Sequence, residues 1–486
     1  MKIQLCSSHF SFNGFLQSLR LLILLPVLSL ASCATGAIVA RQDLPHPNEI
    51  RAPESKVVAQ QLQVSGPRGR LSPVARERML KALGLEGNAS SVQRHLSAMS
   101  AIGEVVLYSG NEAKLLVDGP ATFEAMFAAI ETATQSVLLE SYIVEDVEVA
   151  KRLSLLLAKK RAQGVLVAMI YDGLGSYATK ESYFNELRAS GILVCAFNPV
   201  KPSKRLGYWN ITHRDHRKIL TVDAQWAFTG GINISGVYSS GSFSKGVFSK
   251  ESIRPKEGWR DTQVQIRGTA AFALDRLVRE TWSSQGCEGD LSKQTSKPSS
   301  QAFGKQVIQI IPATPSAAPN PIYTLLLTSI DASQRSIFIT MAYFAPGEDL
   351  IEALCDAALR GVDVQLILPS VSDFSPVLYA GQSYYQRLLK AGVKIFELQT
   401  AVLHAKTAVV DGVVSTIGSS NMDWRSFASN NEVNAVMIGE DFGDSMFKMF
   451  AQDLSASREV VLSEWEKRSL WRRAKEQVSR ALERFW

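Results

Sequence analysis

Two stretches of the sequence, far apart along the chain, repeat one order of chemically active side chains. In both, a lysine follows a histidine by two positions, an aspartate by seven, a glycine by fourteen and an asparagine by seventeen. The first stretch contains His216, Lys218, Asp223, Gly230 and Asn233, and the second contains His404, Lys406, Asp411, Gly418 and Asn421. Only six histidines occur in the chain, so two of them in matching positions indicate a shared chemical purpose.

These residue types suit the transfer of a phosphoryl or phosphodiester group. An imidazole acts as a nucleophile or exchanges a proton near neutral pH. Lysine ammonium groups and asparagine amides bind phosphate oxygens and stabilise developing negative charge. Residues two apart in a strand point to the same face, so each histidine should project beside its lysine. A single copy would be explained as well by a structural strand with a hydrogen-bonded histidine, but two copies in register favour a functional pair.

The surrounding elements are repeated as well, in the order strand, helix, buried strand and end of a second helix. The ranges are 136–142, 147–161, 164–172 and 187–191 in the first copy, and 336–343, 349–359, 361–368 and 388–392 in the second. Strands and helices that alternate in this way predict α/β lobes, in which helices flank a mixed sheet. A repeat of this length indicates two similar lobes and not a solenoid of short units.

Length and composition agree with a two-lobed globular protein. The chain has 486 residues, too many for one ordinary core, and its 46% hydrophobic and 20% charged residues are typical of folded proteins. In chain order we predict a signal peptide, a tether that turns helical near Pro73, a first lobe, a second lobe and a basic amphipathic helix. These segments are 1–32, 33–102, 103–291, 301–460 and 461–486, with a polar linker at 292–300 between the lobes. The net charge of +6 leaves nucleic acid, anionic lipid and plain solubility open.

The N-terminus predicts a secreted and lipid-anchored protein. An apolar run at 21–30 follows Lys2 and Arg20, and it is shorter than the roughly 20 apolar residues of a spanning helix. Leu-Ala-Ser-Cys at 30–33 resembles the lipobox of bacterial lipoproteins, which predicts acylation of Cys33. A chance cysteine behind an uncleaved anchor is the alternative. Because Ala34 stands where inner-membrane lipoproteins carry aspartate, we expect the periplasmic side of the cell envelope, at the outer membrane in preference to the inner one.

The remaining cysteines predict neither a disulfide framework nor a metal site. Cys195, Cys287 and Cys355 are odd in number, and two of them lie in apolar patterns, so all three are predicted to be buried thiols. The sequence has neither a Cys-x-x-Cys motif nor a cluster of histidine and cysteine. We therefore expect no metal and no cofactor.

The paired motifs, each followed by Gly-Gly/Ser-x-Asn, resemble those of the phospholipase D superfamily over residues 103–460. Further stretches resemble bacterial cardiolipin synthases in particular. They are 171–176, 197–199, 210–216, 342–349, 403–411 and 418–426. The resemblance implies one active site at the seam of two lobes that are related by a pseudo-twofold axis. The lipobox is a departure, since the familiar cardiolipin synthases begin with two membrane-spanning helices.

The resemblance also implies a role for each residue of the motifs. His216 would attack phosphorus and form a phosphohistidine, while His404 would protonate the leaving alkoxide and later activate the acceptor; the reverse order stays open. Orienting carboxylates for the two histidines would be Asp261 and Glu432. The groups expected to hold the phosphate oxygens are Lys218, Lys406, Asn233 and Asn421. Asp223 and Asp411 are interpreted as braces of the motifs rather than as an acid or base.

The last residues predict a basic amphipathic helix. Apolar residues recur with helical spacing at 470, 471, 474, 478, 481, 482 and 485, and basic residues occupy much of the rest. Such a helix suits an anionic lipid surface. A terminal helix that docks on the core of the protein explains the pattern equally well.

These observations favour a phosphatidyltransferase of cardiolipin synthase type, with phosphatidylglycerol as the substrate and a membrane surface as the partner. A phospholipase D-type hydrolase or nuclease of the same fold is the first alternative, and an inactive lipid-binding lipoprotein is the second. Two intact motifs argue against inactivity. A nuclease would need a basic groove, and only scattered charges are present at Lys201, Lys204 and Arg205, so no nucleic acid is expected. Aromatic residues that could line a lipid entrance are Tyr208, Trp209 and Trp424.

Overall fold

The computed structural model covers the chain and describes most of both lobes. The described residues are 41–43, 62–83, 91–100, 105–200, 212–242, 258–291 and 300–485. Several sequence predictions fall outside these ranges. They concern the signal peptide and Cys33, the charges at Lys201, Lys204 and Arg205, the aromatic residues Tyr208 and Trp209, and all of the linker except its last residue.

The first lobe is a mixed sheet with the strand order β6-β5-β4-β8-β9-β10-β3. Its strands are β3 (Val106–Val117), β4 (Ser136–Ser141), β5 (Leu166–Asp172), β6 (Leu193–Phe197), β8 (Lys218–Val222), β9 (Trp226–Gly230) and β10 (Thr262–Arg267). Its helices are α5 (Asp118–Glu131), α6 (Glu148–Ala162), α7 (Glu181–Ala189) and α8 (Thr269–Ser284). The strands β4, β5 and β6 are parallel to one another. The other neighbouring strands, from the pair β4–β8 to the pair β10–β3, are antiparallel, which confirms the predicted mixed α/β sheet.

The second lobe repeats this order as β15-β14-β12-β16-β17-β19-β11. Its strands are β11 (Gln306–Ala313), β12 (Ser336–Met341), β14 (Asp363–Pro369), β15 (Lys394–Leu398), β16 (Lys406–Val410), β17 (Val414–Gly418) and β19 (Asn430–Ile438). Its helices are α9 (Pro321–Ala332), α10 (Glu348–Leu359), α11 (Ser375–Gln382), α12 (Tyr385–Ala391), α13 (Trp424–Ala428) and α14 (Glu440–Ser455). The internal repeat of the sequence therefore appears as two lobes with the same topology.

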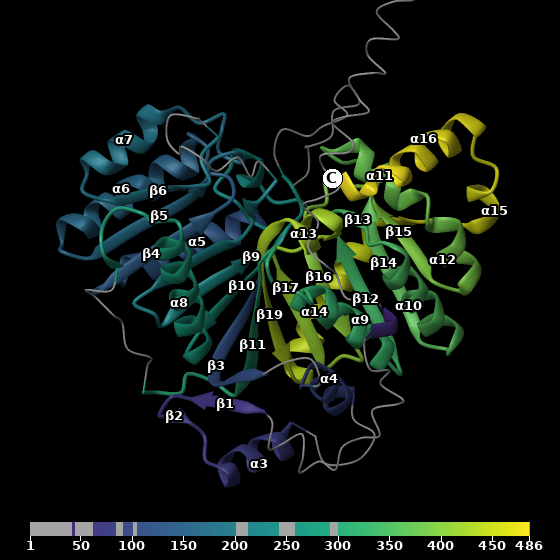
Figure 1. Ribbon diagram of the computed structural model, residues 1–486, viewed down its shortest axis with the longest axis horizontal. Helices are drawn as coiled ribbons and strands as arrows, with labels where there is room; N and C mark the ends of the chain where they lie inside the picture. The colour runs from purple at the N-terminus through teal and green to yellow at the C-terminus, as the bar shows by residue number, and fades with distance from the viewer. Residues whose placement is uncertain are drawn as a thin grey trace, which may run out of the picture.

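The two lobes join through their equivalent strands β3 and β11, which pair antiparallel and make one continuous sheet (Figure 1). A hydrophobic core runs beneath the joint, where Val264 and Leu274 of the first lobe pack in one cluster with Ile417 and Val433 of the second. Because buried apolar side chains pack at crystal-like density, this shared core fixes the lobes relative to one another.

Local sequence signals set the ends of several helices. Asn320 caps α9, since its side chain accepts hydrogen bonds from the main-chain N–H groups of Ile322 and Tyr323 at 3.0 Å each, and Pro321 follows at the first helical position. The helix α12 ends at Gly392, whose φ of 97° is the left-handed conformation that glycine adopts readily.

The described part of the predicted tether is packed on the lobes. The strand β1 (Gln63–Gly66) pairs with the hairpin strand β2 (Gly69–Arg70) and lies parallel to β3, and the helices α3 (Pro73–Ala82) and α4 (Ser91–Ser100) follow. The side chains of Leu62 and Leu96 are fully buried in the core of the second lobe. The predicted helix near Pro73 is present as α3. The packing of this segment on the second lobe was not predicted, because its composition is rich in proline and polar residues.

The cysteine prediction is wrong for two residues. Cys195 of β6 and Cys287, which follows α8, form a disulfide between positions 92 residues apart. Cys355 is a buried free thiol, as predicted. The odd number of cysteines does not exclude this bond, because a pairing between such distant residues depends on the fold and not on sequence spacing. The disulfide ties the outermost strand of the first lobe to the helix that lies under its sheet.

The described residues contain neither a membrane-spanning helix nor a cluster of metal-binding side chains. None of the helices in these ranges combines the length and the apolar character that crossing a bilayer requires. Within the same ranges, no group of three or more histidine, cysteine, aspartate or glutamate side chains is placed to hold a metal ion.

Candidate active site

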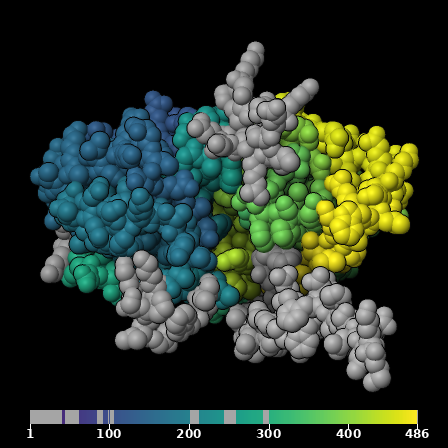
Figure 2. All heavy atoms as spheres, turned by 90° about the horizontal axis from the view of Figure 1, so that it is seen from above, coloured from purple at the N-terminus to yellow at the C-terminus, as the bar shows by residue number. Residues whose placement is uncertain are grey.

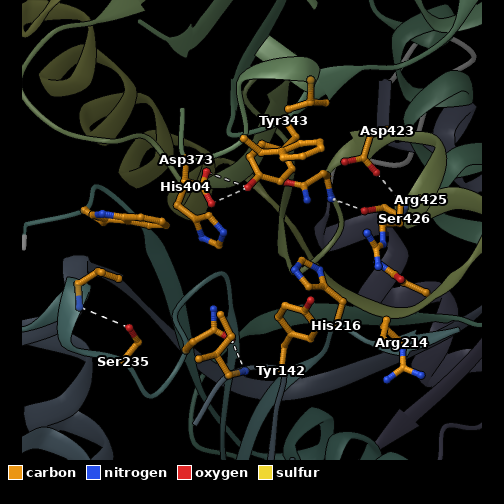
Figure 3. A pocket seen from close by; sticks show the side chains of 18 of the residues that line it. Tyr142, Arg214, His216, Ser235, Tyr343, Asp373, His404, Asp423, Arg425 and Ser426 are labelled. Atoms are coloured by element: carbon orange, nitrogen blue, oxygen red, sulfur yellow. Dashed lines mark hydrogen bonds between the residues drawn. The ribbon is translucent and has the colours of Figure 1, made fainter. Parts of the chain in front are cut away.

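The two motif histidines face one another across the seam of the lobes (Figure 3). His216 lies two residues before the start of β8 and His404 two residues before the start of β16, and these are equivalent strands of the repeat. Both imidazoles line one cavity of about 410 Å³ that takes residues from both lobes. Other cavity residues are Tyr142, Arg214, Asn233, Tyr238, Trp259, Tyr343, Asp373, Asn421, Asp423 and Arg425.

His216 of the first lobe is held by the second lobe at two points. Its main-chain N–H donates to the carbonyl oxygen of Asn431 at 3.0 Å. Its ring Nδ1 lies 3.0 and 3.1 Å from the two carboxylate oxygens of the next residue, Glu432. When Nδ1–H donates to this carboxylate, the lone pair of Nε2 is left for the cavity.

His404 of the second lobe is held by the first lobe in the same way. Its main-chain N–H donates to the carbonyl oxygen of Arg260 at 2.8 Å, and its Nδ1 lies 2.7 Å from Oδ2 of Asp261. The Tyr238 hydroxyl is 3.0 Å from the same ring nitrogen. Each histidine is therefore oriented by a carboxylate of the opposite lobe, so neither lobe alone contains a complete site.

The electrostatics of the first pair keep the carboxylate charged and the imidazole neutral. Burial would raise the pKa of Glu432, but His216, the charge of Lys218 and a hydrogen bond from Ser419 outweigh it and lower that pKa to about 2. The Ser419 hydroxyl donates to Glu432 at 2.5 Å. Burial, and then the nearby Lys218 and Lys406, lower the pKa of His216 to about 4. A neutral imidazole is the form that attacks phosphorus.

The motif lysines lie behind their histidines. The ammonium of Lys218 donates to the carbonyl oxygen of His216 at 2.5 Å, and that of Lys406 donates to the carbonyl oxygen of His404. Burial, and then repulsion by Lys406, lower the pKa of Lys218 to about 7, and burial lowers that of Lys406 to about 8. The pKa of His404 is lowered by burial and by Lys406. The surroundings of these side chains therefore disfavour their positive charge, and a bound anion would stabilise that charge.

The motif asparagines line the cavity, one from each lobe. The side-chain oxygen of Asn233 accepts a hydrogen bond from the main-chain N–H of Ile143 at 3.1 Å. Asn421 donates its main-chain N–H to the Ser426 hydroxyl at 3.1 Å, and its side-chain oxygen is buried without a hydrogen-bond partner in the part of the chain that the structure describes. Both amides are placed to meet a ligand between the imidazoles.

The motif aspartates lie at the far ends of the motif strands and do not line the cavity. Asp223 accepts hydrogen bonds from the main-chain N–H groups of Gln135 and Ser136, both at 2.8 Å. Asp411 accepts from Arg335 at 2.7 Å and from Ser336 at 3.0 Å. Each aspartate thus fastens a motif strand to the start of its neighbouring strand, and this geometry suits a brace and not an acid or base.

Aromatic cavity residues were missed in the sequence. The ring of Tyr142 meets that of His216 edge to face at 4.9 Å, and the Tyr343 hydroxyl donates to Asp373 at 2.8 Å. Tyr142 is the first residue after β4 and Tyr343 is the second residue after the equivalent strand β12, so a tyrosine just beyond each of these strands is the signal that could have pointed to both. Trp424, which the sequence suggested for the entrance, does not line the cavity; the Arg484 guanidinium lies 4.9 Å over its ring.

A repeated lobe with a histidine from each copy at one seam defines a phospholipase D-like fold. The solved phosphatidylserine synthase of Haemophilus influenzae Rd KW20 is similar to it, with a TM-score of 0.59 over 77% of this chain and 95% of that one at 11% identity. At that identity the likeness concerns the fold alone.

Sequence comparison gives the family. The family model for the cardiolipin synthase, phospholipase D-like domain matches residues 126–243 and 326–454. The chain is 35% identical over 384 residues to the cardiolipin synthase of Geobacillus sp. (strain WCH70), and the matched region covers 78% of this chain and 74% of that one. Over 379 residues it is 34% identical to the cardiolipin synthase of Listeria welshimeri, with 78% and 76% covered. The chain therefore belongs to the cardiolipin synthase family of phospholipase D-like phosphatidyltransferases.

Proposed function

We propose that this protein condenses two molecules of phosphatidylglycerol into cardiolipin and glycerol, by way of a phosphohistidine on His216. The observation that carries the proposal is the pair of imidazoles at the seam, each fixed through Nδ1 by a carboxylate of the opposite lobe. This arrangement leaves two Nε2 atoms facing one space, which is what a displacement with an attacking and a departing group requires. The relatives named cardiolipin synthase support the substrate.

In the first step, Nε2 of His216 attacks phosphorus and a nitrogen–phosphorus bond forms. The bond from phosphorus to the headgroup oxygen breaks, and Nε2–H of His404 gives its proton to that oxygen, which releases glycerol. In the second step, Nε2 of His404 removes a proton from the terminal hydroxyl of a second phosphatidylglycerol. That oxygen attacks phosphorus, the nitrogen–phosphorus bond breaks, and His216 is restored.

Negative charge grows on the non-bridging oxygens in both steps. Lys218 and Lys406 supply positive charge behind the imidazoles, and the amides of Asn233 and Asn421 donate hydrogen bonds to the oxygens. A bound phosphodiester also raises the pKa of His404, because an anion stabilises the imidazolium. Substrate binding thus favours the protonated imidazole of His404, which then gives its proton to the leaving group.

The acceptor decides between the transferase and a hydrolase of the same fold. Purified protein with phosphatidylglycerol vesicles should form cardiolipin and free glycerol in equal amounts, while the His404→Ala variant should form neither. Phosphatidic acid as the main product, unchanged by added phosphatidylglycerol or glycerol, would contradict the transferase and establish the hydrolase.

The site of action that we propose is the periplasmic side of the bacterial cell envelope, at the outer membrane, with residues 1–32 removed and Cys33 acylated. The lipobox-like residues 30–33 support this placement, as does the Cys195–Cys287 disulfide, since disulfides persist in oxidising compartments such as the periplasm. Mass analysis of the purified chain and of its Cys33→Ser variant tests it. Equal masses and equal membrane partition in the two would refute acylation.

A further inference from the structure

The C-terminal helix α16 (Leu470–Ala481) turns its apolar face away from the protein. Leu470 is 80% exposed, Trp471 72% and Val478 62%, and Ala474 and Ala481 on the same face are exposed as well. A helix that packs on its own core normally buries this face. The reversal leaves a contiguous apolar strip in solvent. The helix itself lies at the outer edge of the second lobe, in the yellow C-terminal part of the chain (Figures 1 and 2).

The polar face of α16 holds this orientation through buried contacts. Glu476 is fully buried, and the Arg468 Nε donates to both of its carboxylate oxygens at 3.0 Å. Ser479 is buried on the same side, and the Arg480 guanidinium lies 4.5 Å over the ring of Tyr384. Rolling the helix to bury its apolar strip would break the Arg468–Glu476 pair, which is costly for buried charges. The exposure of the strip is therefore built into the packing.

Charge and position together identify what covers the strip. Lys475 and Arg484 are exposed beside it, and such side chains reach from an apolar surface to anionic headgroups. Lys475 also lies 5.4 Å over the ring of Tyr379 in α11, which connects the strip to the cavity. The start of that helix borders the active site, where Val377 and the 39% exposed Phe374 line the cavity.

We propose that the outward face of α16, formed by Leu470, Trp471, Ala474, Val478 and Ala481, docks on the surface of an anionic phospholipid bilayer and sets the active-site cavity beside the lipid headgroups. The inference rests on the proposed function for the identity of the substrate. Docking itself is measurable without turnover, so the two can fail separately.

The direct test is a polarity-sensitive fluorophore on Val478→Cys, in the full chain with the inactivating His404→Ala change. A probe on Leu155→Cys is the matched control, because Leu155 is 74% exposed on α6 of the first lobe. With vesicles of phosphatidylglycerol and phosphatidylcholine, the emission at position 478 should shift to the blue and rise severalfold, with little change at 155. No change at 478, or equal changes at both positions, would overturn the proposal. So would a blue shift that follows protein concentration without vesicles, since it would mean a second copy.

A second test links docking to catalysis in the active protein. Trp471→Glu with Val478→Glu should lower, severalfold, the ratio of turnover on vesicles to turnover on detergent-dispersed phosphatidylglycerol. Leu155→Glu should leave this ratio unchanged. An unchanged ratio in the double variant would contradict docking by α16. If the unaltered protein forms no cardiolipin at all, the proposed function fails, and the fluorescence result still decides the docking.

Discussion

At the scale of single residues, the orientation of each histidine depends on a carboxylate that is 216 positions away for His216 and 143 positions away for His404. Asp261 and Glu432 stood out only by the family resemblance, and nothing in their spacing tells which histidine each contacts. The structure crosses them, with Asp261 on His404 and Glu432 on His216. Such pairing is a property of the assembled seam. The motif lysines, asparagines and aspartates, by contrast, were identifiable because repetition in register is visible in the chain itself.

Removing one negative charge at the seam should impair catalysis and spare the fold. Glu432→Gln keeps the shape of the side chain but no longer stabilises a positive imidazole or fixes its tautomer. By analogy with other histidine–carboxylate pairs, we expect kcat to fall roughly a thousandfold. Asp261→Asn should act similarly through His404. The matched control is Glu440→Gln, an exposed carboxylate at the start of α14. Unchanged circular dichroism shows retained folding, and turnover near that of the unaltered protein would contradict the orienting role.

The pH dependence of activity should reflect the protonation of the histidines and lysines at the cavity. The pKa of His216 is about 4, so kcat/KM should rise with pH through that value as the nucleophile loses its proton. On the alkaline side activity should fall as His404, whose pKa is lowered, and then Lys218 and Lys406, with pKa values of about 7 and 8, are deprotonated. A bound phosphodiester raises all three pKa values, so the alkaline limb of kcat should lie at higher pH than that of kcat/KM. Coincident limbs would contradict this electrostatic coupling.

At the scale of elements, periodicity gave the right helices and strands but not the direction in which every face points. The predicted strands and helices of both repeats match β4, α6, β5 and their partners β12, α10, β14 within a few residues. The apolar stripe of α16 was equally visible. However, α16 packs on the protein through its polar face, which the Arg468–Glu476 ion pair holds in place. A hydropathy pattern does not reveal such an ion pair.

The disulfide offers a prediction at this scale. Cys195→Ala with Cys287→Ala frees a loop of 92 residues between β6 and the end of α8, and should lower the free energy of unfolding by about 2–5 kcal/mol. Denaturant unfolding under non-reducing conditions measures the effect. The cavity lies on other elements, so turnover per folded molecule should be kept. Cys355→Ala serves as the control for losing a buried cysteine, and an equal loss of stability there would show that the disulfide contributes nothing.

At the scale of the whole molecule, the seam is a structural joint as much as an active site. The Arg260 side chain of the first lobe donates to Asp453 of α14 at 2.6 and 2.8 Å, and the Arg217 Nε donates to the main-chain oxygen of Glu432 at 3.1 Å. These buried contacts flank both histidines. Two equivalent lobes could be anticipated from the repeat, and their shared seam from the family resemblance. The particular contacts across the seam could not, because they join residues far apart in the chain.

The pseudo-twofold symmetry is broken at the cavity, and we propose that this difference gives the two histidines different tasks. Nδ1 of His216 contacts only the carboxylate of Glu432 among the described residues, while Nδ1 of His404 also has Tyr238 and Lys406 at 3.0 Å. Asp261 favours the protonated form of the His404 imidazole, which is the form that gives a proton to a leaving group. The pKa of about 4 keeps the His216 imidazole neutral, so its Nε2 lone pair is available to attack phosphorus.

A covalent intermediate should therefore form on His216 alone. In the His404→Ala variant, resolution of the intermediate lacks its base, so phosphatidylglycerol with an activated leaving group should accumulate a phosphatidyl adduct. Denaturation and proteolysis at alkaline pH, where phosphohistidine survives, followed by mass spectrometry, locate it. The peptide that contains His216 should carry one phosphatidyl group per chain. In the His216→Ala variant, the peptide of His404 should stay unmodified under the same treatment, and an adduct there would reverse the assignment of nucleophile and acid.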